Sequence, residues 1–280
     1  MRKIAVVGLS KKIGIFEFIK NIKKYETQYN FETEEFIYSN KEFNLYDVLS
    51  PVNFNPNDYF AAISVGGDGT FLYTSRVFAG TEIPVLGVNI GQLGFNTNIE
   101  LKDFDYYFEN FLNNKVEFDY KSMLDVQIEG DDKIYNVLNE GVISHTGISR
   151  MIRLKVDLEG HCIYDFRGDG LIISSPTGST AYNLSAGGPI LHPDVDAFSL
   201  CPICPHTLAI RPFIIPFCEK LIISILESST QPQITLDGQK IILLDIGQKI
   251  VFKKSTKKTK TIKSDKNFYE ILKLKLGWLG

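Results

Sequence analysis

The pattern of apolar residues changes near residue 120, and this change constrains the fold more than any other feature. Before it, short apolar runs alternate with segments whose apolar residues recur at helical spacing. The expected strands are Ile4–Val7, Phe60–Val65 and Val85–Asn89, and the expected helices are Ile13–Tyr25 and Phe71–Phe78. Strands and helices that alternate in this way are typical of a parallel sheet. We therefore predict a Rossmann-like α/β domain over residues 1–117.

After residue 120, short β-type runs follow one another with turn residues between them and no clear helices. These runs are Met123–Glu129, Lys133–Ser144, Met151–Leu158, Leu171–Ser175, Leu221–Leu226, Gln233–Leu236 and Gln248–Phe252. Many short strands without helices indicate an all-β domain such as a sandwich. We therefore predict a β-sandwich-like domain over residues 118–266. The last segment, Tyr269–Trp278, is too apolar for a free tail, and we expect it to dock on the fold.

The charge balance excludes several classes of partner. Lys and Arg number 30 against 33 Asp and Glu, which gives a net charge of −3 and a pI near 5.9. Nucleic acids and anionic membranes select a basic excess, so we expect neither as a partner. The lysine-rich stretch Lys253–Lys266 is expected to be a solvated loop or hairpin rather than a phosphate-binding tail. No signal peptide and no run of about 18 apolar residues is present, which predicts a cytoplasmic location.

The segment Gly66-Gly67-Asp68-Gly69-Thr70 directly follows an expected strand and precedes an expected helix. Glycines allow phosphates to approach the backbone, and a helix N-terminus attracts anions. A carboxylate in such a loop repels phosphate. Asp68 therefore indicates a further role, which is to accept a proton from an attacking hydroxyl or to help hold a divalent ion. The alternative is a simple turn in which Asp68 caps the helix.

Three further segments combine glycines with polar side chains. Gly87–Phe95 is a second Gly-rich loop, which could line one crevice with the first at the carboxyl ends of the strands. Arg167–Pro189 contains Asp169, which can accept hydrogen bonds from ribose hydroxyls, and Tyr182, which can stack on a base. The alternative for this segment is a turn-rich connection in a β domain. The pair Asn139-Glu140 is too short to be a motif by itself.

Taken in chain order, these segments resemble the motifs of bacterial NAD kinases, which phosphorylate NAD with ATP to give NADP. The matching segments are Gly66–Thr70, Gly91–Phe95, Asn139-Glu140, Asp169–Ile172, Pro176–Tyr182, Ser185–Pro189, His206–Leu208 with Arg211-Pro212, Asp237–Gln239 and Lys275–Trp278. The resemblance covers residues 60–278. Its most specific part is Thr177–Tyr182, whereas Gly-Gly-Asp-Gly-Thr also occurs in related lipid kinases.

The resemblance implies a role for each matched residue. Asp68 would be the base that takes the proton of the 2′-hydroxyl of the adenosine ribose of NAD, which then attacks the γ-phosphorus of ATP. Phosphates would bind at Gly66, Gly67, Gly69 and Thr70, with Mg²⁺ as the divalent ion and no metal ligands assigned to protein side chains. The implied NAD contacts are Asp68, Gly69, Phe95, Asn139, Glu140, Arg150, Arg167, Asp169, Thr180, Ala181, Tyr182, Ser185 and Gln239. The alternative for Arg150 is a solvent-facing arginine in a loop.

The resemblance also implies the assembly. Members of the family are homodimers or homotetramers, so we expect a homo-oligomer. Their C-terminal segment returns to the first domain, which implies the same for residues 267–280. The sequence does not decide whether NADH is accepted besides NAD, or whether inorganic polyphosphate can replace ATP as the donor.

Two other functions share part of these motifs. A lipid or sphingoid-base kinase would share Gly66–Thr70, but the chain carries Thr177–Tyr182 and shows no membrane-binding amphipathic helix. A non-catalytic dinucleotide-binding regulator predicts loss of the acid, whereas Asp68 and Asn139-Glu140 are present. We therefore favour NAD kinase over both.

Cysteines and histidines carry no further motif. Cys201, Cys204 and His206 are of metal-ligand type, but a zinc site usually needs four ligands and no second Cys pair exists. The remaining histidines without motif partners, which we expect at surface or structural positions, are His145, His161 and His192.

Overall fold

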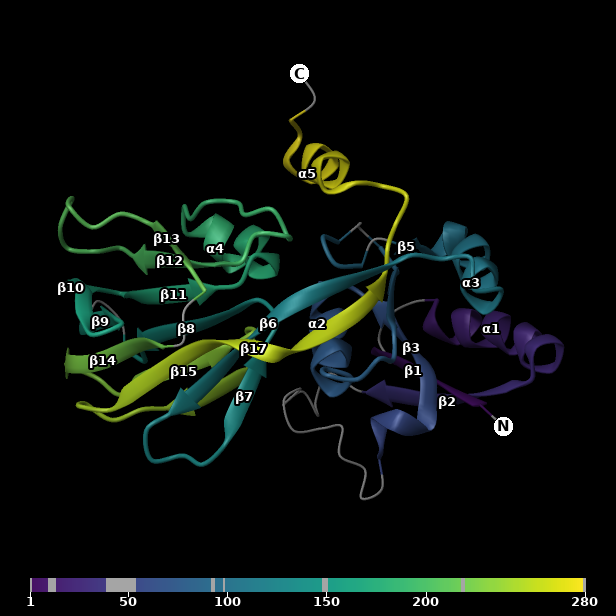
Figure 1. Cartoon of the computed structure of the whole chain (residues 1–280), viewed down its shortest axis with the longest axis horizontal. Helices are drawn as coiled ribbons and strands as arrows, with labels where there is room; N and C mark the ends of the chain where they lie inside the picture. The colour runs from purple at the N-terminus through teal and green to yellow at the C-terminus, as the bar shows by residue number, and fades with distance from the viewer. Residues whose placement is uncertain are drawn as a thin grey trace. The chain divides into compact units, whose positions relative to one another are not determined.

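The structure, a computed structural model, describes residues 2–9, 14–38, 54–91, 94–97, 99–147, 151–217 and 220–278. It divides into two compact units, which are Met1–Lys121 with Lys257–Gly280, and Ser122–Thr256. Two long strands, β6 (Phe118–Ile128) and β17 (Lys249–Ile262), each begin in one unit and end in the other (Figure 1). The boundaries predicted after residues 117 and 266 lie outside these strands, because an apolar pattern does not reveal where within a strand one unit gives way to the next.

The N-terminal unit alternates strands and helices. Its elements in chain order are β1 (Arg2–Leu9), α1 (Ile15–Tyr29), β2 (Phe31–Tyr38), η2 (Pro56–Asp58), β3 (Tyr59–Gly66), α2 (Asp68–Val77), β4 (Val85–Asn89), β5 (Ile99–Glu100), η3 (Leu101–Asp103), α3 (Phe104–Leu112) and, at the C-terminus, α5 (Phe268–Leu276). The strands pair in parallel in the order β4-β3-β1-β2, and β5 pairs with β4. The predicted α/β fold is therefore confirmed.

Helices cover both faces of this sheet (Figure 1). On one face, Ile15 and Phe18 of α1 and Phe108 of α3 pack with alternate residues of β1, β3 and β4. On the other face, Tyr73 of α2 packs against Val7 of β1. Because the strands are covered on both sides, their residues form nearly continuous apolar runs, which is why the sequence revealed them.

The parallel register brings two loops to one edge of the sheet. Gly66 is the last residue of β3 and pairs with Asn89, the last residue of β4. The segments that follow, Gly67–Thr70 and Gly94–Thr97, therefore start from neighbouring strand ends. Ligands of α/β sheets commonly bind at this carboxyl edge.

The C-terminal unit is built of antiparallel strands. Its remaining elements are β7 (Ile134–Val137), β8 (Glu140–His145), β9 (Ile152–Leu158), β10 (His161–Gly168), β11 (Gly170–Ser174), η4 (Thr177–Thr180), α4 (Tyr182–Ser185), β12 (Ala197–Ile203), β13 (Phe213–Pro216), β14 (Leu221–Ser228), β15 (Pro232–Leu236) and β16 (Lys240–Leu243). One sheet has the order β13-β12-β11-β8-β15-β16, and the other contains β10, β9, β14, β17, β6 and β7.

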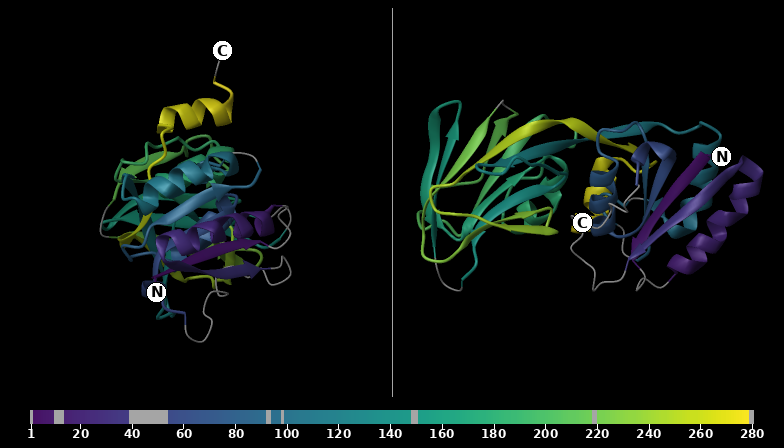
Figure 2. Two further views of the ribbon diagram at one scale, coloured as in Figure 1. Left: turned by 90° about the vertical axis from the view of Figure 1, so that its right-hand side faces the viewer. Right: turned by 90° about the horizontal axis from the view of Figure 1, so that it is seen from below.

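The two sheets of this unit form the layers of a sandwich (Figure 2). Gly141 of β8 lies against the ring of Phe252 of β17, so a Cβ atom there would be 2.7 Å from the ring. On the opposite face of the first sheet, Val142, Ile172 and Cys201 form a buried cluster against Ala186, just after α4. The predicted β-sandwich-like fold is confirmed.

The lysine-rich stretch was predicted wrongly. Residues 253–262 are neither a loop nor a hairpin but the last ten residues of β17, and within the stretch only residues 263–266 are irregular. Ser255, Thr259 and Thr261 are buried along it, and Thr261 pairs with Val85 of β4. The apolar C-terminal segment forms α5, in which Ile271 and Leu272 are buried and Trp278 beyond the helix is exposed.

Candidate active site

Asp68 is the first residue of α2, directly after the turn that ends β3. Gly67 occupies the N-cap position in an extended conformation, and no side chain caps the helix. The alternative in which Asp68 is a helix cap is therefore wrong. The carboxylate instead reaches the segment Gly94–Thr97, which follows β4 in the chain.

Four hydrogen bonds hold the Asp68 carboxylate. The backbone N–H of Phe95 donates to Oδ2 at 2.9 Å, and those of Asn96 and Thr97 each donate to Oδ1 at 3.0 Å. The Thr97 hydroxyl also donates to Oδ1, at 3.1 Å. Gly94 makes this close approach possible, because a Cβ atom there would lie 2.1 Å from Oδ1. The loop therefore fixes a carboxylate at the carboxyl edge of the sheet.

The start of α2 and the side chain of Lys121 both interact with the charge of this carboxylate. The N-terminus of α2 carries the positive end of the helix dipole, which favours anions. The ammonium of Lys121, in β6, also feels the charge of Asp68. Burial lowers the pKa of Lys121, whereas the carboxylates of Asp119 and Asp68 oppose that change. The start of α2 therefore places the positive end of a helix dipole beside a potential proton acceptor.

In the C-terminal unit, Asn139 lies in the break between β7 and β8, and Glu140 begins β8. The carboxylate of Asp237 holds this break together. Its Oδ2 accepts the N–H of Leu138 at 3.1 Å, and its Oδ1 accepts those of Asn139 at 2.7 Å and Glu140 at 3.3 Å. Asp237 lies in the turn between β15 and β16 with φ +49°, and its own N–H donates to the Glu140 carbonyl at 2.9 Å. The turn therefore sets the backbone of the Asn139-Glu140 pair.

The Glu140 carboxyl group is buried beside a second acid. Only 5% of Glu140 is exposed, and burial raises the pKa of its carboxyl to about 8, with the Asp237 charge as the second cause. Its Oε2 and the Oδ1 of Asn139 have no hydrogen-bond partner within the described residues. Buried polar atoms normally have partners, so these two atoms fit a ligand that supplies them.

The segment Thr177–Ser185 forms η4 and α4 and packs against this pair. Gly178 lies so close to Asn139 that a Cβ atom would be 2.3 Å from the Asn139 carbonyl oxygen. The backbone N–H of Ser175 donates to the same oxygen at 2.8 Å. Buried Asn183 fixes the segment, with its Nδ2 donating to the carbonyl of Pro189 at 2.9 Å. The specific Thr-Gly-Ser-Thr motif therefore positions Asn139.

A pocket of about 680 Å³ opens on this face of the C-terminal unit. Three predicted residues, Glu140, Asp169 and Tyr182, line it. Glu140, Val142 and Ser144 share this wall because side chains alternate along β8. The walls among the described residues are Glu140, Val142, Ser144, His145, Gly147, Asp169, Tyr182, Ile203, Thr235 and Gly238.

Other predicted residues lie near this pocket without lining it. Thr180, Ala181 and Ser185 belong to the η4 and α4 segment beside Tyr182. Gln239 is next to Gly238 in the turn after β15, where its N–H donates to the Leu236 carbonyl at 2.9 Å. Asn139 directly precedes the pocket residue Glu140 in the chain, and its backbone lies against Gly178. Arg150 falls outside the described residues.

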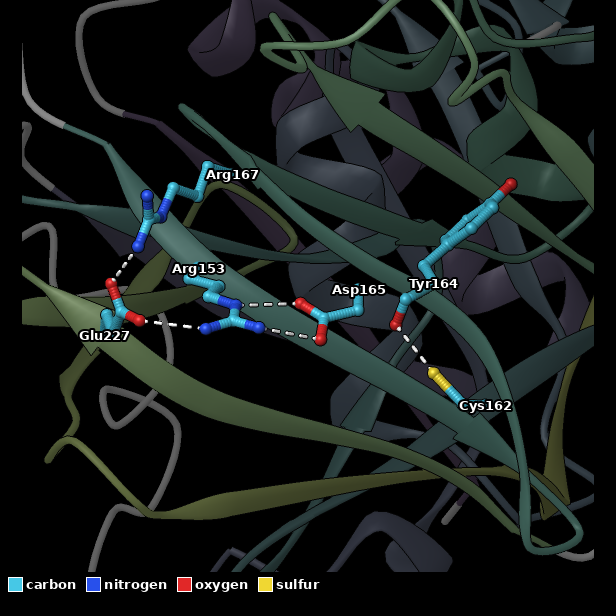
Figure 3. Close-up of polar contacts among 6 residues, drawn as sticks. All are labelled: Arg153, Cys162, Tyr164, Asp165, Arg167 and Glu227. Atoms are coloured by element: carbon cyan, nitrogen blue, oxygen red, sulfur yellow. Dashed lines mark hydrogen bonds and ion pairs between the residues drawn. The ribbon is translucent and has the colours of Figure 1, made fainter.

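The Arg167 side chain takes part in a network of ion pairs (Figure 3). Its Nη2 lies 2.6 Å from the Glu227 carboxylate, which also accepts from Arg153 at 2.9 Å. Arg153 in turn makes a two-bond contact with Asp165, at 2.9 and 3.0 Å. Arg167 is therefore bound to Glu227 rather than turned into the pocket.

Within the described residues, no group of three or more His, Cys, Asp or Glu side chains is placed to hold a metal ion. None of the helices that these residues form is both long and apolar enough to cross a membrane.

Two family models match the chain. That of the ATP-NAD kinase N-terminal domain matches residues 15–116, and that of the ATP-NAD kinase C-terminal domain matches residues 138–264. The chain belongs to the NAD kinase family. The NAD kinase of Treponema denticola is 37% identical over 285 residues, which cover 100% of this chain and 98% of the relative. The NAD kinase of Aquifex aeolicus is 36% identical, with 99% of this chain and 100% of the relative covered.

Solved structures of NAD kinases and an NADH kinase have the same fold. A yeast NADH kinase complexed with NADH has a TM-score of 0.84 and 20% identity, covering 100% of this chain and 88% of that one. An NAD kinase from Archaeoglobus fulgidus in complex with ATP has a TM-score of 0.78 and 23% identity, covering 99% and 100%. These structures support the fold, while the family models and the relatives confirm the expected family, and the lipid-kinase alternative is not favoured.

Sequence reasoning assigned no role to three residues of this NAD kinase that lie at the candidate site. Thr97 contacts Asp68, Asp237, which was matched only as part of a motif, holds Asn139 and Glu140, and His145 lines the pocket. Nε2 of His145 is 4.0 Å from Asp169, the residue that directly precedes β11, which pairs with β8. Alternation along β8 assigns His145 to the face opposite Glu140, Val142 and Ser144, so it gave no signal for His145, and no local signal marks the partner of Asp68.

Proposed function

We propose that Asp68 is the proton acceptor of this NAD kinase, which transfers the γ-phosphoryl group of ATP to the 2′-hydroxyl of the adenosine ribose of NAD. The supporting observation is the carboxylate itself, fixed at the carboxyl edge of a parallel sheet by the loop Gly94–Thr97. In the reaction, the proton of the hydroxyl goes to Asp68 while the hydroxyl oxygen bonds to the γ-phosphorus. The bond between the γ-phosphorus and its bridging oxygen breaks, and ADP leaves.

The ATP phosphates are proposed to bind at Gly66, Gly67, Gly69 and Thr70. The start of α2 at Asp68 supports this assignment, because a helix N-terminus offers N–H groups and a positive dipole end to anions. Mg²⁺ keeps several waters and binds largely through substrate phosphates, so it would be held here by ATP, and no side chain is assigned as its ligand. When bound, the ion would neutralise charge on the transferred group.

NAD is proposed to bind in the C-terminal unit at the pocket lined by Glu140, Asp169 and Tyr182. Carboxyl groups suit ribose hydroxyls, and Tyr182, nearly half exposed, offers a ring face. With a pKa of about 8, the Glu140 carboxyl is protonated at neutral pH and can donate as well as accept. The unpartnered atoms of Asn139 and Glu140 support an adenosine contact here.

The other predicted NAD contacts remain part of the proposal. These are Asp68, Gly69, Phe95, Asn139, Arg150, Arg167, Thr180, Ala181, Ser185 and Gln239. Arg167 would have to leave Glu227 to reach a ligand bound in the pocket. Its replacement by alanine therefore tests whether it contributes to the KM for NAD.

The active form is proposed to be a cytoplasmic homo-oligomer, a dimer or a tetramer. Exposed apolar side chains of the C-terminal unit support self-association, with Leu208, Phe213 and Ile214 exposed by 85, 49 and 43%. Light scattering of the purified chain measures its mass directly, and a monomer at micromolar concentration would refute the oligomer. Cell fractionation tests the location.

The test of the reaction is NADP formation from NAD, ATP and Mg²⁺ by the wild type and by Asp68→Asn. We expect the variant to be slower by about 10² or more, which is the usual contribution of a general base. Asp132→Asn is the matched control, because Asp132 is exposed and lies outside the site. A variant near the wild-type rate would remove Asp68 as the base, and a folded wild type that forms no NADP would refute the activity.

A further inference from the structure

The two oxygens of the Asp68 carboxylate are bound unequally. Oδ1 accepts three hydrogen bonds, from the N–H groups of Asn96 and Thr97 and from the Thr97 hydroxyl. Within the described residues, Oδ2 accepts one, from the N–H of Phe95. A carboxylate oxygen has about two lone-pair positions, so Oδ1 is saturated and Oδ2 keeps room for one more donor.

The Thr97 hydroxyl links this carboxylate to the sheet. Asn89, the last residue of β4, donates from Nδ2 to Thr97 Oγ1 at 3.0 Å. The amide nitrogen can only donate and the carboxylate can only accept, so the single hydroxyl proton of Thr97 must point at Asp68. Asn89 is 4% exposed and Thr97 is fully buried, so water does not compete for these bonds.

We infer that Asn89 and Thr97 are positioning residues of the phosphoryl transfer, which hold Oδ1 so that Oδ2 is the atom that takes the proton. This inference rests on the proposed role of Asp68 as the base. The chain runs from Asn89 Nδ2–H to Thr97 Oγ1–H to Asp68 Oδ1, and it prevents the carboxylate from turning about its Cβ–Cγ bond. The acceptor hydroxyl of the substrate then meets one defined oxygen, and its proton passes to Oδ2 as its oxygen attacks the phosphorus.

The first test replaces the Thr97 hydroxyl without changing the size of the side chain. In Thr97→Val, Oδ1 loses a donor, which makes the charged carboxylate easier to protonate. We expect kcat for NADP formation to fall about tenfold, and the acidic limb of the kcat/KM profile to move up by about one pH unit, as for the loss of a hydrogen bond to a charged group. The KM for ATP should stay within about twofold, because no phosphate contact changes.

Two further variants separate positioning from a merely structural role. Thr97→Ser keeps the hydroxyl and should restore both kcat and the acidic limb. Asn89→Ala removes the donor to Thr97 and should move the limb in the same direction by a smaller amount. The position of the limb does not depend on the fraction of folded enzyme, so it can be measured even where a variant is less stable.

Specific results would overturn the inference. An unshifted acidic limb in Thr97→Val, or equal losses in Thr97→Val and Thr97→Ser, would show that the hydroxyl does not act through Asp68. The double variant Asp68→Asn with Thr97→Val should be no slower than Asp68→Asn alone, and an additive loss would also refute it. If Asp68→Asn keeps the wild-type rate, the base assignment fails first, and that outcome is distinct from an unshifted limb.

Discussion

The buried carboxyl group of Glu140 predicts an unusual dependence of stability on pH. Its pKa rises from 4.5 to about 8 in the folded protein, first because of burial and then because of the Asp237 charge. The folded state therefore binds this proton more tightly than the unfolded state does. The contribution of this proton to the free energy of unfolding is complete below about pH 4.5. It is lost as the pH rises towards about 8, because folding then requires a buried charge.

The magnitude follows from linkage. Between these two pKa values, each pH unit removes about 1.4 kcal/mol from the free energy of unfolding. Glu140→Gln keeps the shape of the side chain but cannot ionise. The difference in unfolding free energy between Glu140→Gln and the wild type should thus rise by about 2 to 3 kcal/mol from pH 5 to pH 7, in favour of the variant.

Urea denaturation without nucleotide, at pH 5, 6 and 7, measures this difference. Titration of the groups that do not interact with Glu140 is common to both proteins and cancels. Glu17→Gln, at an exposed position in the first turn of α1, is the matched control and should show a constant difference. Parallel pH profiles for Glu140→Gln and the wild type would refute the raised pKa and, with it, the protonated carboxyl in the pocket.

Three other substitutions test separate contacts. Asp237→Asn weakens the hydrogen bonds to Leu138, Asn139 and Glu140. We expect urea denaturation to show a loss of about 2 kcal/mol in unfolding free energy, and we expect a higher KM for NAD. An unchanged KM would contradict the positioning role of Asp237. Gly94→Ala places a Cβ atom 2.1 Å from Asp68 Oδ1 and should abolish most NADP formation. Gly130→Ala, in a turn with φ +87° and no atom within 4 Å, strains its own turn but should keep NADP formation. Arg153→Ala breaks exposed ion pairs with Asp165 and Glu227. It should cost less than about 1 kcal/mol in unfolding free energy, and 1 M salt should reduce this loss further. A loss well above this value would show that the ion pairs stabilise the fold.

The sequence predicted the elements that are buried on both faces. β3 and β4 appear as apolar runs because helices cover them on both sides, and the Gly-rich turn between β3 and α2 marks a strand end and a helix start. The β-rich half was recognised for a related reason, since turn residues separate its short strands. These are local signals, and each can be detected in a short window of sequence.

The part that the sequence missed depends on long-range contacts. Asp68 and Thr97 are 29 positions apart, and Asp237 meets Asn139 across 98 positions, so no local spacing pairs them. The second half of β17 was misjudged because its lysines suggested solvent. Its buried face alternates Thr259 and Thr261, and β-branched residues at alternate positions were the signal that the lysines obscured.

The passage of β17 from one unit to the other has a consequence for the order in which the protein is made. Thr261 donates from Oγ1 to the Val85 carbonyl at 2.9 Å, and the N–H of Gly80 donates to the Lys258 carbonyl at 3.1 Å. The partners Val85 and Gly80 leave the ribosome long before residues 257–262 do. The whole C-terminal unit is synthesised in between, so a nascent chain can complete its first sheet only after its second unit has emerged.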